Sequence, residues 1–317
     1  MKKIAVLVLA LLIALTATAL ADFPEKQITV VCPYGAGGAS DTTSRIYGSM
    51  LQEAAGVPVI VDNRTGSNGA VGLTFGAQAD PDGYTITYMP VESVINKFLG
   101  IGEVTTDDFK FIGLAMTIPA AITVRADSEW NTFEDFLAYA KEHPGEITVG
   151  NSGTGSIWHI AAAAVEDNCG VELDHIPYPD GAASAIAGLL GGEIDAVAVS
   201  AAEVSTYVAD GQLKTLVILG SNHCSAEALK DVPTATELGY NVSVEGWGGF
   251  AVPASTDDAI VAKLVELSDT AINSDSMKEL LASKGYEHSY KNGADTDAYA
   301  KAQLDYYGQL VPTLELQ

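Results

Sequence analysis

The chain has 317 residues, of which 48% are hydrophobic, and this length is enough for two domains with buried cores. Asp and Glu number 41 against 16 Lys and Arg, so the formal net charge is −25. A charge of this sign argues against nucleic-acid partners and anionic membrane surfaces, because both repel an acidic protein.

The first 21 residues are typical of a secretory signal peptide. Met1–Lys3 is positively charged, Ile4–Leu15 is apolar, and Ala19 and Ala21 stand at the small positions before a cleavage site. The apolar run is too short for a transmembrane helix, which needs about 20 residues. We therefore expect a periplasmic mature protein that begins near Asp22.

Strand and helix patterns alternate along the first part of the mature sequence. In chain order they predict a strand at 27–32, a helix at 40–56, a strand at 57–62, a short helix at 73–83 and a strand at 84–89. This order is typical of a parallel sheet with helices on its faces.

The alternation restarts after two apolar segments, 109–116 and 120–128. The elements predicted next are a helix at 131–145, a strand at 147–151, helices at 156–168 and 182–192, a strand at 194–199, a helix at 202–211 and a strand at 213–220. Three helical segments close the chain, and the last one, 294–311, is amphipathic. The chain is thus predicted to form two α/β lobes with a cleft between them.

Each half contains a glycine-rich turn between a strand and a helix. The first turn lies in CPYGAGGASDTTSR (32–45) and the second in ITVGNSGTGSIWHIAAAAVE (147–166). A helix start has unpaired N–H groups and the positive end of the helix dipole, and glycine lets a ligand approach them. Two such turns predict an anion site without Lys or Arg, although each could also be a tight turn without a ligand. Asp41 is interpreted as a helix cap that holds the first turn in shape.

Ser156 and His159 lie three residues apart on one predicted helix face, which is also compatible with a nucleophile and its base. Ser156 does not stand in a G-x-S-x-G elbow, so a helix cap or an anion donor describes it better. His159 is expected either to point into the cleft or to support the turn. A hydrolase that uses Ser156, His159 and Asp195 remains an alternative.

Cysteine and histidine patterns predict neither a metal site nor a cofactor, because no Cys-x-x-Cys pair or His cluster occurs. The sequence contains Cys32, Cys169 and Cys224. Cys32 is interpreted as a buried strand residue. A Cys169–Cys224 disulfide is left open at this stage.

An ordered series of motifs resembles the extracytoplasmic solute-binding receptors of the tripartite tricarboxylate transporter type, the Bug or TctC family. The segments that carry the resemblance are PYGAGGASDTTSR (33–45), VDNRTGSNGAVG (61–72), GNSGTGSIWHIAA (150–162), HIPYPDGAASAIAGLLGGEIDA (175–196), DVPTATELGY (231–240) and EGWGGFAVPA (245–254). Together they span nearly all of the mature sequence.

The resemblance implies an α/β, two-lobe periplasmic binding protein of type II, a Venus flytrap that encloses its ligand in the cleft. Lobe 1 is expected to comprise 22–122 and 222–317, and lobe 2 to comprise 123–221. Ligand contacts are expected in both turns, namely at Tyr34, Ala36, Gly37, Gly38 and Asp41 in the first and at Ser152, Gly153, Thr154, Gly155, Ser156 and His159 in the second. Asp195 matches an acid that meets the ligand's amino group or a water. Tyr178 and segment 90–96, with Ser93, are expected to line the distal pocket.

The implied function is the capture of a small organic acid, a di- or tricarboxylate or an amino-acid-like carboxylate, for the membrane subunits of such a transporter. A monomeric receptor without enzymatic activity is expected, and a sensory subunit for a histidine kinase is the alternative. Pro179 and Asp180 stand where Lys-Gly is common, and Glu92 adds an acid at the distal end. These departures favour a ligand with a hydrogen-bond donor or an ammonium group at its far end.

Overall fold

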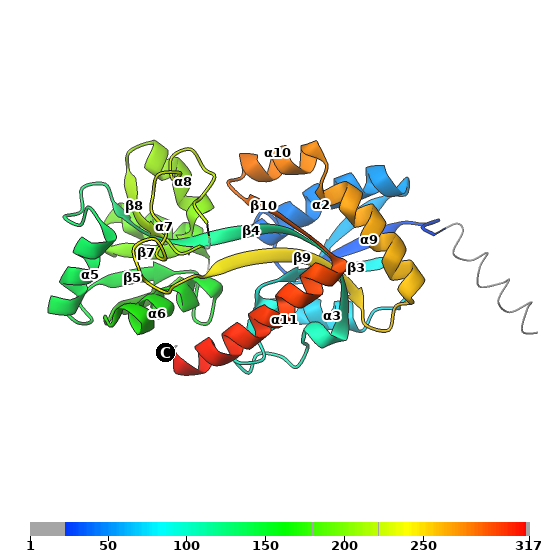
Figure 1. Ribbon diagram of the computed structural model, residues 1–317, viewed down its shortest axis with the longest axis horizontal. Helices are drawn as coiled ribbons and strands as arrows, with labels where there is room; N and C mark the ends of the chain where they lie inside the picture. The colour runs from blue at the N-terminus through cyan, green and yellow to red at the C-terminus, as the bar shows by residue number, and fades with distance from the viewer. Residues whose placement is uncertain (1–22, 179–180, 221, 315–317) are drawn as a thin grey trace, which may run out of the picture.

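The computed structural model describes residues 23–178, 181–220 and 222–314, so the predicted signal peptide lies outside the described residues. Two α/β lobes lie side by side and are joined by two strands, β4 (Phe109–Arg125) and β9 (Glu245–Pro253) (Figure 1). In the described part of the chain, no helix combines the length and the apolar character that crossing a bilayer requires.

Lobe 1 is built around three parallel strands with β1 in the middle. β1 is followed along the chain by β2 on one side and then by β3 on the other. The elements of this part are β1 (Ile28–Cys32), α2 (Ala39–Ala55), β2 (Val59–Asn63), α3 (Ala70–Ala77), β3 (Thr85–Pro90), α4 (Glu92–Ile95) and the 3-10 turn η1 (Thr106–Asp108).

Lobe 2 repeats this plan, with β5 between β6 and β7. Its elements are α5 (Phe133–Glu142), β5 (Thr148–Asn151), α6 (Ile157–Cys169), β6 (Asp174–Pro177), α7 (Ala182–Gly191), β7 (Ala196–Ser200), α8 (Ala201–Ala209) and β8 (Leu213–Ile218). In each lobe the next strand along the chain lies on one side of the middle strand, and the strand after it lies on the other side. The carboxyl end of β1 and that of β5 are therefore topological switch points, where open α/β sheets bind ligands.

The two crossing strands belong to both lobes. β4 pairs with β9 as far as Pro119 and with β7 from Ala120 onward, so the change of partner lies close to the predicted boundary at 122. The predicted return to lobe 1 was placed at 222, and the chain packs on lobe 2 beyond that residue. Residues 223–244 pack on lobe 2, where Cys224 and Leu229 join its core and Tyr240 meets Phe133 edge to face, before β9 crosses back.

The C-terminal part covers lobe 1 and the crossing strands. It consists of α9 (Asp258–Ile272), α10 (Asp275–Ser283), β10 (Glu287–Asn292), α11 (Gly293–Leu310) and the 3-10 turn η2 (Val311–Thr313). The long helix α11 runs along the crossing strands toward lobe 2 (Figure 1). Tyr307 of α11 is buried in the same core as Trp247 of β9.

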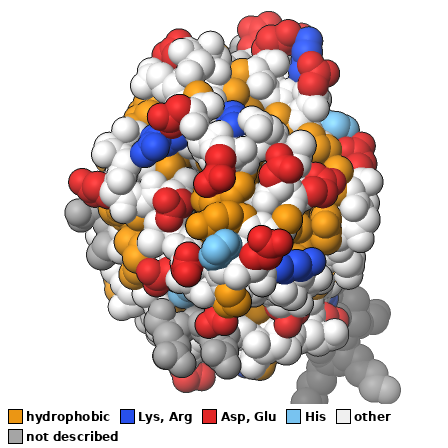
Figure 2. Space-filling model, turned by 90° about the vertical axis from the view of Figure 1, so that its left-hand side faces the viewer, with side chains coloured by type: hydrophobic (Ala, Val, Ile, Leu, Met, Phe, Trp, Pro, Cys, Tyr) orange, Lys and Arg blue, Asp and Glu red, His pale blue; other side chains and the backbone are white. Residues whose placement is uncertain are grey.

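Cys32, Cys169 and Cys224 are all buried and all free, so the disulfide that the sequence left open is not formed. Cys169 and Cys224 pack in different core clusters. The outer surface is acidic, as Figure 2 shows for the lobe 2 end, where Asp and Glu side chains are many and Lys and Arg side chains few.

Candidate functional site

The first glycine loop, residues 33–38, connects the middle strand β1 to helix α2. Gly37 has φ of +92°, a backbone conformation that favours glycine, and Gly38 is the N-cap without a side-chain cap bond. The backbone N–H of Gly37 donates to Asp41 Oδ2 at 2.9 Å. Asp41 therefore holds the loop as predicted, although its carboxylate reaches back before the helix rather than to an N–H of the first turn.

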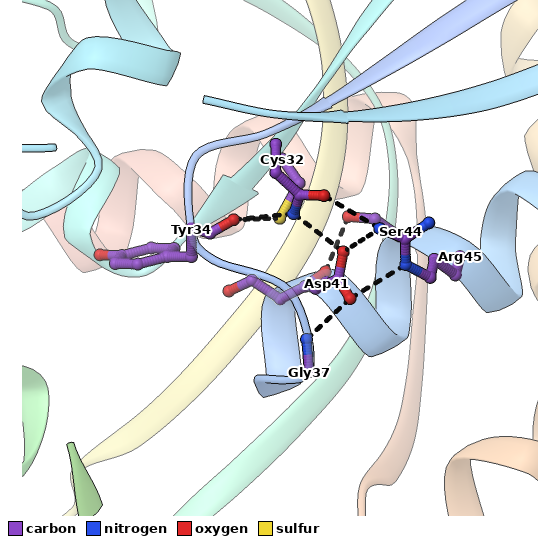
Figure 3. A network of polar contacts seen from close by, with 8 residues as sticks. Cys32, Tyr34, Gly37, Asp41, Ser44 and Arg45 are labelled. Carbon is purple, nitrogen blue, oxygen red and sulfur yellow. Dashed lines mark hydrogen bonds and ion pairs between the residues drawn. The ribbon is translucent and has the colours of Figure 1, made fainter. Parts of the chain in front are cut away.

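Asp41 is only 3% exposed and is surrounded by donors (Figure 3). Arg45 donates from Nε to Oδ2 at 3.0 Å and from Nη2 to Oδ1 at 2.8 Å, and Asn63 Nδ2 donates to Oδ1 at 2.8 Å. Burial raises the pKa of Asp41, but the hydrogen bonds from Arg45, Gly37 and Asn63 outweigh it and keep the pKa below its usual range. The ring of Tyr34 points away from this network.

The second glycine loop, residues 152–156, connects the middle strand β5 to helix α6 in the same way. Gly153 and Gly155 have φ of +108° and +74°. Asn151 Oδ1 accepts the N–H of Gly153 at 3.0 Å, and His159 Nδ1 accepts the N–H of Gly155 at 3.0 Å. Ser156 is the N-cap, and its Oγ accepts the backbone N–H of His159 at 3.2 Å.

His159 thus supports the loop, which is one of its two predicted roles, and its side chain does not line the cavity described below. It is 1% exposed. Burial, together with the neighbouring His175, lowers the pKa of His159 to about 4, so the ring is neutral at pH 7. A neutral ring is required for Nδ1 to accept the Gly155 N–H.

Both loops line one cavity between the lobes, with a volume of about 730 Å³. We call it the interlobe cavity; its lining residues are Tyr34, Gly35, Gly38, Ala39, Ser40, Asn68, Tyr88, Pro90, Val91, Glu92, Met116, Ile118, Ser152, Gly153, Thr154, Ser156, Ile157, Trp158, Gly181, Ser200, Glu203, Gly246, Trp247 and Tyr286. Helices α2, α6, α7 and α8 all begin at this cavity, since their N-caps are Gly38, Ser156, Gly181 and Ser200. Its size is within the range of small-molecule sites.

The charged side chains among these lining residues are both acidic, Glu92 from lobe 1 and Glu203 from lobe 2. Burial raises the pKa of Glu92 to about 7, against the hydrogen-bonding effect of the Tyr34 hydroxyl. Desolvation also raises the pKa of Glu203, with Ser200 Oγ donating to its carboxylate at 2.6 Å. Within the described lining, a bound anion would therefore meet helix N–H groups and hydroxyls rather than Lys or Arg.

The predicted site residues separate into three groups. Those that line the interlobe cavity are Tyr34, Gly38, Ser152, Gly153, Thr154 and Ser156. Ala36, Gly37, Asp41, Gly155 and His159 belong to the same two loops or the helix starts behind them, without being among the lining residues.

Three predicted residues do not belong to the cavity. Asp195 is at the amino end of β7, away from the loops, and its carboxylate accepts the backbone N–H and the hydroxyl of Thr148 at 2.9 and 2.6 Å. Tyr178 packs its ring against α7 at Gly188 and against Gly150. Ser93 is buried in α4, behind Pro90, Val91 and Glu92, which do line the cavity. Asp195, Tyr178 and Ser93 are thus not among the lining residues of the interlobe cavity, and a ligand contact by any of them stays a prediction.

Sequence reasoning missed the starts of helices α7 and α8 and several large side chains that line the cavity. Gly181, Ser200 and Glu203 stand at or near the starts of α7 and α8, which follow the carboxyl ends of β6 and β7. Ligands of open α/β sheets bind at the carboxyl ends of the strands. The starts of α7 and α8 also lie there, so this rule could have predicted their place in the site. Tyr88, Met116, Trp158, Trp247 and Tyr286 carry no such local signal, because they come from five different elements or connections.

The Ser156–His159 arrangement does not resemble a nucleophile with its base. Ser156 Oγ accepts a backbone N–H, whereas the His159 ring turns its Nδ1 to the Gly155 N–H. His159 Nε2 is buried without a hydrogen-bond partner among the described residues, and Asp195 lies at the far end of β7. The groups of a catalytic triad are thus not brought together.

Two α/β lobes joined by crossing strands, with helix starts around the cavity between them, define a two-lobe periplasmic binding protein. A family model described as the tripartite tricarboxylate transporter family receptor matches residues 44–316. The chain belongs to this family of periplasmic solute-binding receptors.

Individual relatives agree with this assignment. A TctC solute-binding protein from Polaromonas, solved without ligand, is 36% identical with a TM-score of 0.81, over 92% of this chain and 100% of that one. A UPF0065 protein of Cupriavidus necator is 30% identical over 91% of this chain and 88% of its own length. An R. palustris protein solved with adipate shares the fold at 23% identity, with a TM-score of 0.80, over 92% of this chain and 98% of that one.

Proposed function

We propose that the protein binds one small organic acid in the interlobe cavity and delivers it to the membrane subunits of a tripartite tricarboxylate-type transporter. The observation that carries this proposal is that the glycine loops of both lobes line one cavity whose described walls contain no Lys or Arg. Export through the N-terminal signal peptide completes the proposal.

The ligand's carboxylate is held by the starts of α2 and α6. Gly38, Ser152 and Thr154 present backbone N–H groups, and Ser40 and Ser156 add hydroxyls. A charge at a helix start gains about 0.3–1 kcal/mol, and up to about 2 kcal/mol when partly buried. Each hydrogen bond to a charged group adds about 1.5–3 kcal/mol. These contributions replace the Lys or Arg that such a site otherwise requires.

Closure follows from the position of the loops on different lobes. A ligand that contacts both loops only when the lobes approach stabilises the closed form by that difference in binding free energy. The closed form is then the state that the membrane subunits distinguish from the free receptor. No bond is made or broken in this cycle.

Calorimetric titration of the mature chain with mono-, di- and tricarboxylates and amino acids tests the proposal. Adipate, which the R. palustris neighbour was solved with, belongs in the panel. We expect at least one acid to bind, and its carboxamide analogue to bind at least about 100-fold weaker, because the amide carries no charge for the helix starts. A folded protein that binds none of these acids would contradict the proposal.

Delivery is tested separately in vesicles that contain the two membrane subunits. The rate of uptake of the acid should depend on the receptor and should reach a maximum as the receptor concentration increases. A receptor that binds the acid without supporting uptake would instead favour the sensory alternative.

A further inference from the structure

Two glutamates face the interlobe cavity from opposite lobes. Glu92 begins helix α4 of lobe 1 and is 8% exposed, whereas Glu203 lies in the first turn of helix α8 of lobe 2 and is open to the cavity. No basic side chain of the described chain contributes to the pKa of either carboxyl group. The cavity therefore has two acids and, within its described lining, no protein cation to neutralise them.

Tyrosines line the cavity together with the two carboxyl groups. Tyr88 comes from strand β3 of lobe 1, and Tyr286 precedes strand β10. Trp158 and Trp247 line the same cavity. Aromatic faces next to carboxylates form a surface that attracts a cation and disfavours a second anion.

Closure of the lobes makes an unpaired carboxylate more costly. Glu92 is already nine-tenths buried, and closing the cavity would remove water from Glu203 as well. Burial of carboxylates is unfavourable unless a cation or a proton compensates the charge. Glu203 also occupies the start of α8, so this helix start is neutralised before any ligand arrives.

We propose that the ligand is zwitterionic: its carboxylate lies on the two glycine loops, and an ammonium group lies between Glu92 and Glu203 against Tyr88 and Tyr286. This inference rests on the proposed function and specifies the chemical class of its ligand. The cation on the ligand supplies the positive charge that the protein wall lacks and offsets part of the negative charge of the two glutamates.

The rival arrangement is a dicarboxylate whose second carboxylate accepts a hydrogen bond from protonated Glu92. Burial raises the pKa of Glu92 to about 7, and the titratable groups around it are Tyr34, Tyr88 and Tyr307, whose own pKa values are raised by burial. These tyrosines stay neutral near pH 7. A bound ammonium should drive a proton off Glu92, whereas a second carboxylate should draw a proton onto it.

Calorimetry with ligand pairs of matched length separates the two arrangements. The pairs are succinate with 4-aminobutyrate, glutarate with 5-aminopentanoate and adipate with 6-aminohexanoate, together with α-amino acids and their deaminated analogues. We expect at least one amino acid to bind at least tenfold tighter than its partner. Titrations at pH 7 in buffers of different ionisation enthalpy should show proton release on binding.

Glu203→Gln and Glu92→Gln should each reduce this preference at least tenfold. Glu203→Gln keeps the test valid if the buried Glu92→Gln variant does not fold. Glu279→Gln removes the same charge from exposed α10 and should leave the preference unchanged. Its result controls for the net charge of the protein.

Tighter binding of the dicarboxylates, with proton uptake, would overturn the zwitterion while leaving the receptor function intact. A preference that survives both glutamate substitutions would overturn it too. Failure of every acid to bind to the folded protein would instead count against the proposed function itself.

Discussion

Asp41 places a negative charge directly behind the loop that we propose binds an anion. The conflict is resolved by geometry, because both carboxylate oxygens are used by Gly37, Arg45 and Asn63. Arg45 and Asp41 neutralise each other, and the loop N–H groups that remain keep their positive potential for the cavity. One buried residue thus shapes the site from behind the loop.

Replacement of Asp41 by Ala should lower the free energy of unfolding by about 1.5–3 kcal/mol at pH 7, because charge-assisted hydrogen bonds are lost. The pKa of Asp41 is below its usual range, so this contribution exists above the unfolded pKa and disappears as pH falls through the folded pKa. Urea denaturation at pH 7 and pH 3 should show the difference from wild type shrinking in acid.

The matched control is Asp62→Ala, which breaks the more exposed ion pair with Arg64. This change should lower the stability by less than about 1 kcal/mol. An equal effect of both substitutions would contradict the role given to Asp41.

His159 makes the second loop sensitive to pH. Its pKa is about 4 in the folded protein, below the value of about 6.5 expected in the unfolded chain. As pH falls below 6.5 the unfolded state binds the proton first, so stability is lost between about pH 6.5 and pH 4. Protonation would also remove the acceptor of the Gly155 N–H.

His159→Asn should keep an acceptor for this N–H and abolish the titration. Between pH 7 and pH 4.5, wild type should lose on the order of 1–3 kcal/mol more than the variant. Urea denaturation at several pH values measures this slope. The surface variant His143→Asn should retain the wild-type slope, and a wild-type slope in His159→Asn would refute the assignment.

At the scale of the element, each glycine loop depends on backbone conformations that other residues rarely adopt. Gly155 has φ of +74°, and a Cβ there would lie 3.1 Å from Leu99 Cδ1 of lobe 1. Gly170, at the other end of the same helix α6, has φ of +63° with nothing within 4 Å. An alanine would be strained at both positions, but only at Gly155 would its Cβ meet a side chain of the other lobe.

Gly155→Ala and Gly170→Ala should each lower the stability by about 1–2 kcal/mol, because both force alanine into the left-handed region. Only Gly155→Ala should also weaken ligand binding, by about tenfold or more, since it distorts the loop and presses on the opposite lobe. Denaturation and calorimetry on both variants check this. Equal affinities in the two variants would contradict a role of this loop in binding.

For the whole molecule, ligand binding is expected to bring the lobes together. Trp158 of lobe 2 lines the cavity and packs against hydrophobic side chains of both lobes, with its ring near Gly246 of the crossing strand β9. Asp and Glu side chains predominate over Lys and Arg on the face in Figure 2, and the formal net charge is −25, so local helix dipoles rather than net charge must favour an anion.

Saturating ligand should reduce the radius of gyration measured by small-angle X-ray scattering and change the tryptophan emission. At a ligand concentration 100 times the Kd, the free energy of unfolding should rise by about 2.7 kcal/mol. Trp158→Phe should reduce the emission change, whereas Trp130→Phe, a buried position beside α5, should preserve it. An unchanged radius with bound ligand would argue against closure.

Much of the fold was predictable, because hydrophobic alternation and turn residues act locally. The strands at 27–32, 57–62, 84–89, 147–151 and 213–220 correspond to β1, β2, β3, β5 and β8, and the principal helices begin within a few residues of their predicted starts. The β9 and β10 strands were not predicted. EGWGGFAVP (245–253) was noted only as a family motif. Its glycines have no side chains to form an alternating pattern, and the segment is a strand because it pairs with β3 and β4.

The sequence by itself determined the two-lobe α/β class, the two glycine loops and the Ser156 cap of the second, since strand–turn–helix signals lie within about 20 residues of one another. Only the tertiary structure decided which other groups meet at the cavity. Glu92 and Glu203 are far apart along the chain and face the same cavity from opposite lobes because β4 and β9 join the lobes. Asp195 was expected near the ligand, but it directly precedes strand β7, whose other end reaches the cavity, and local sequence does not distinguish the two ends.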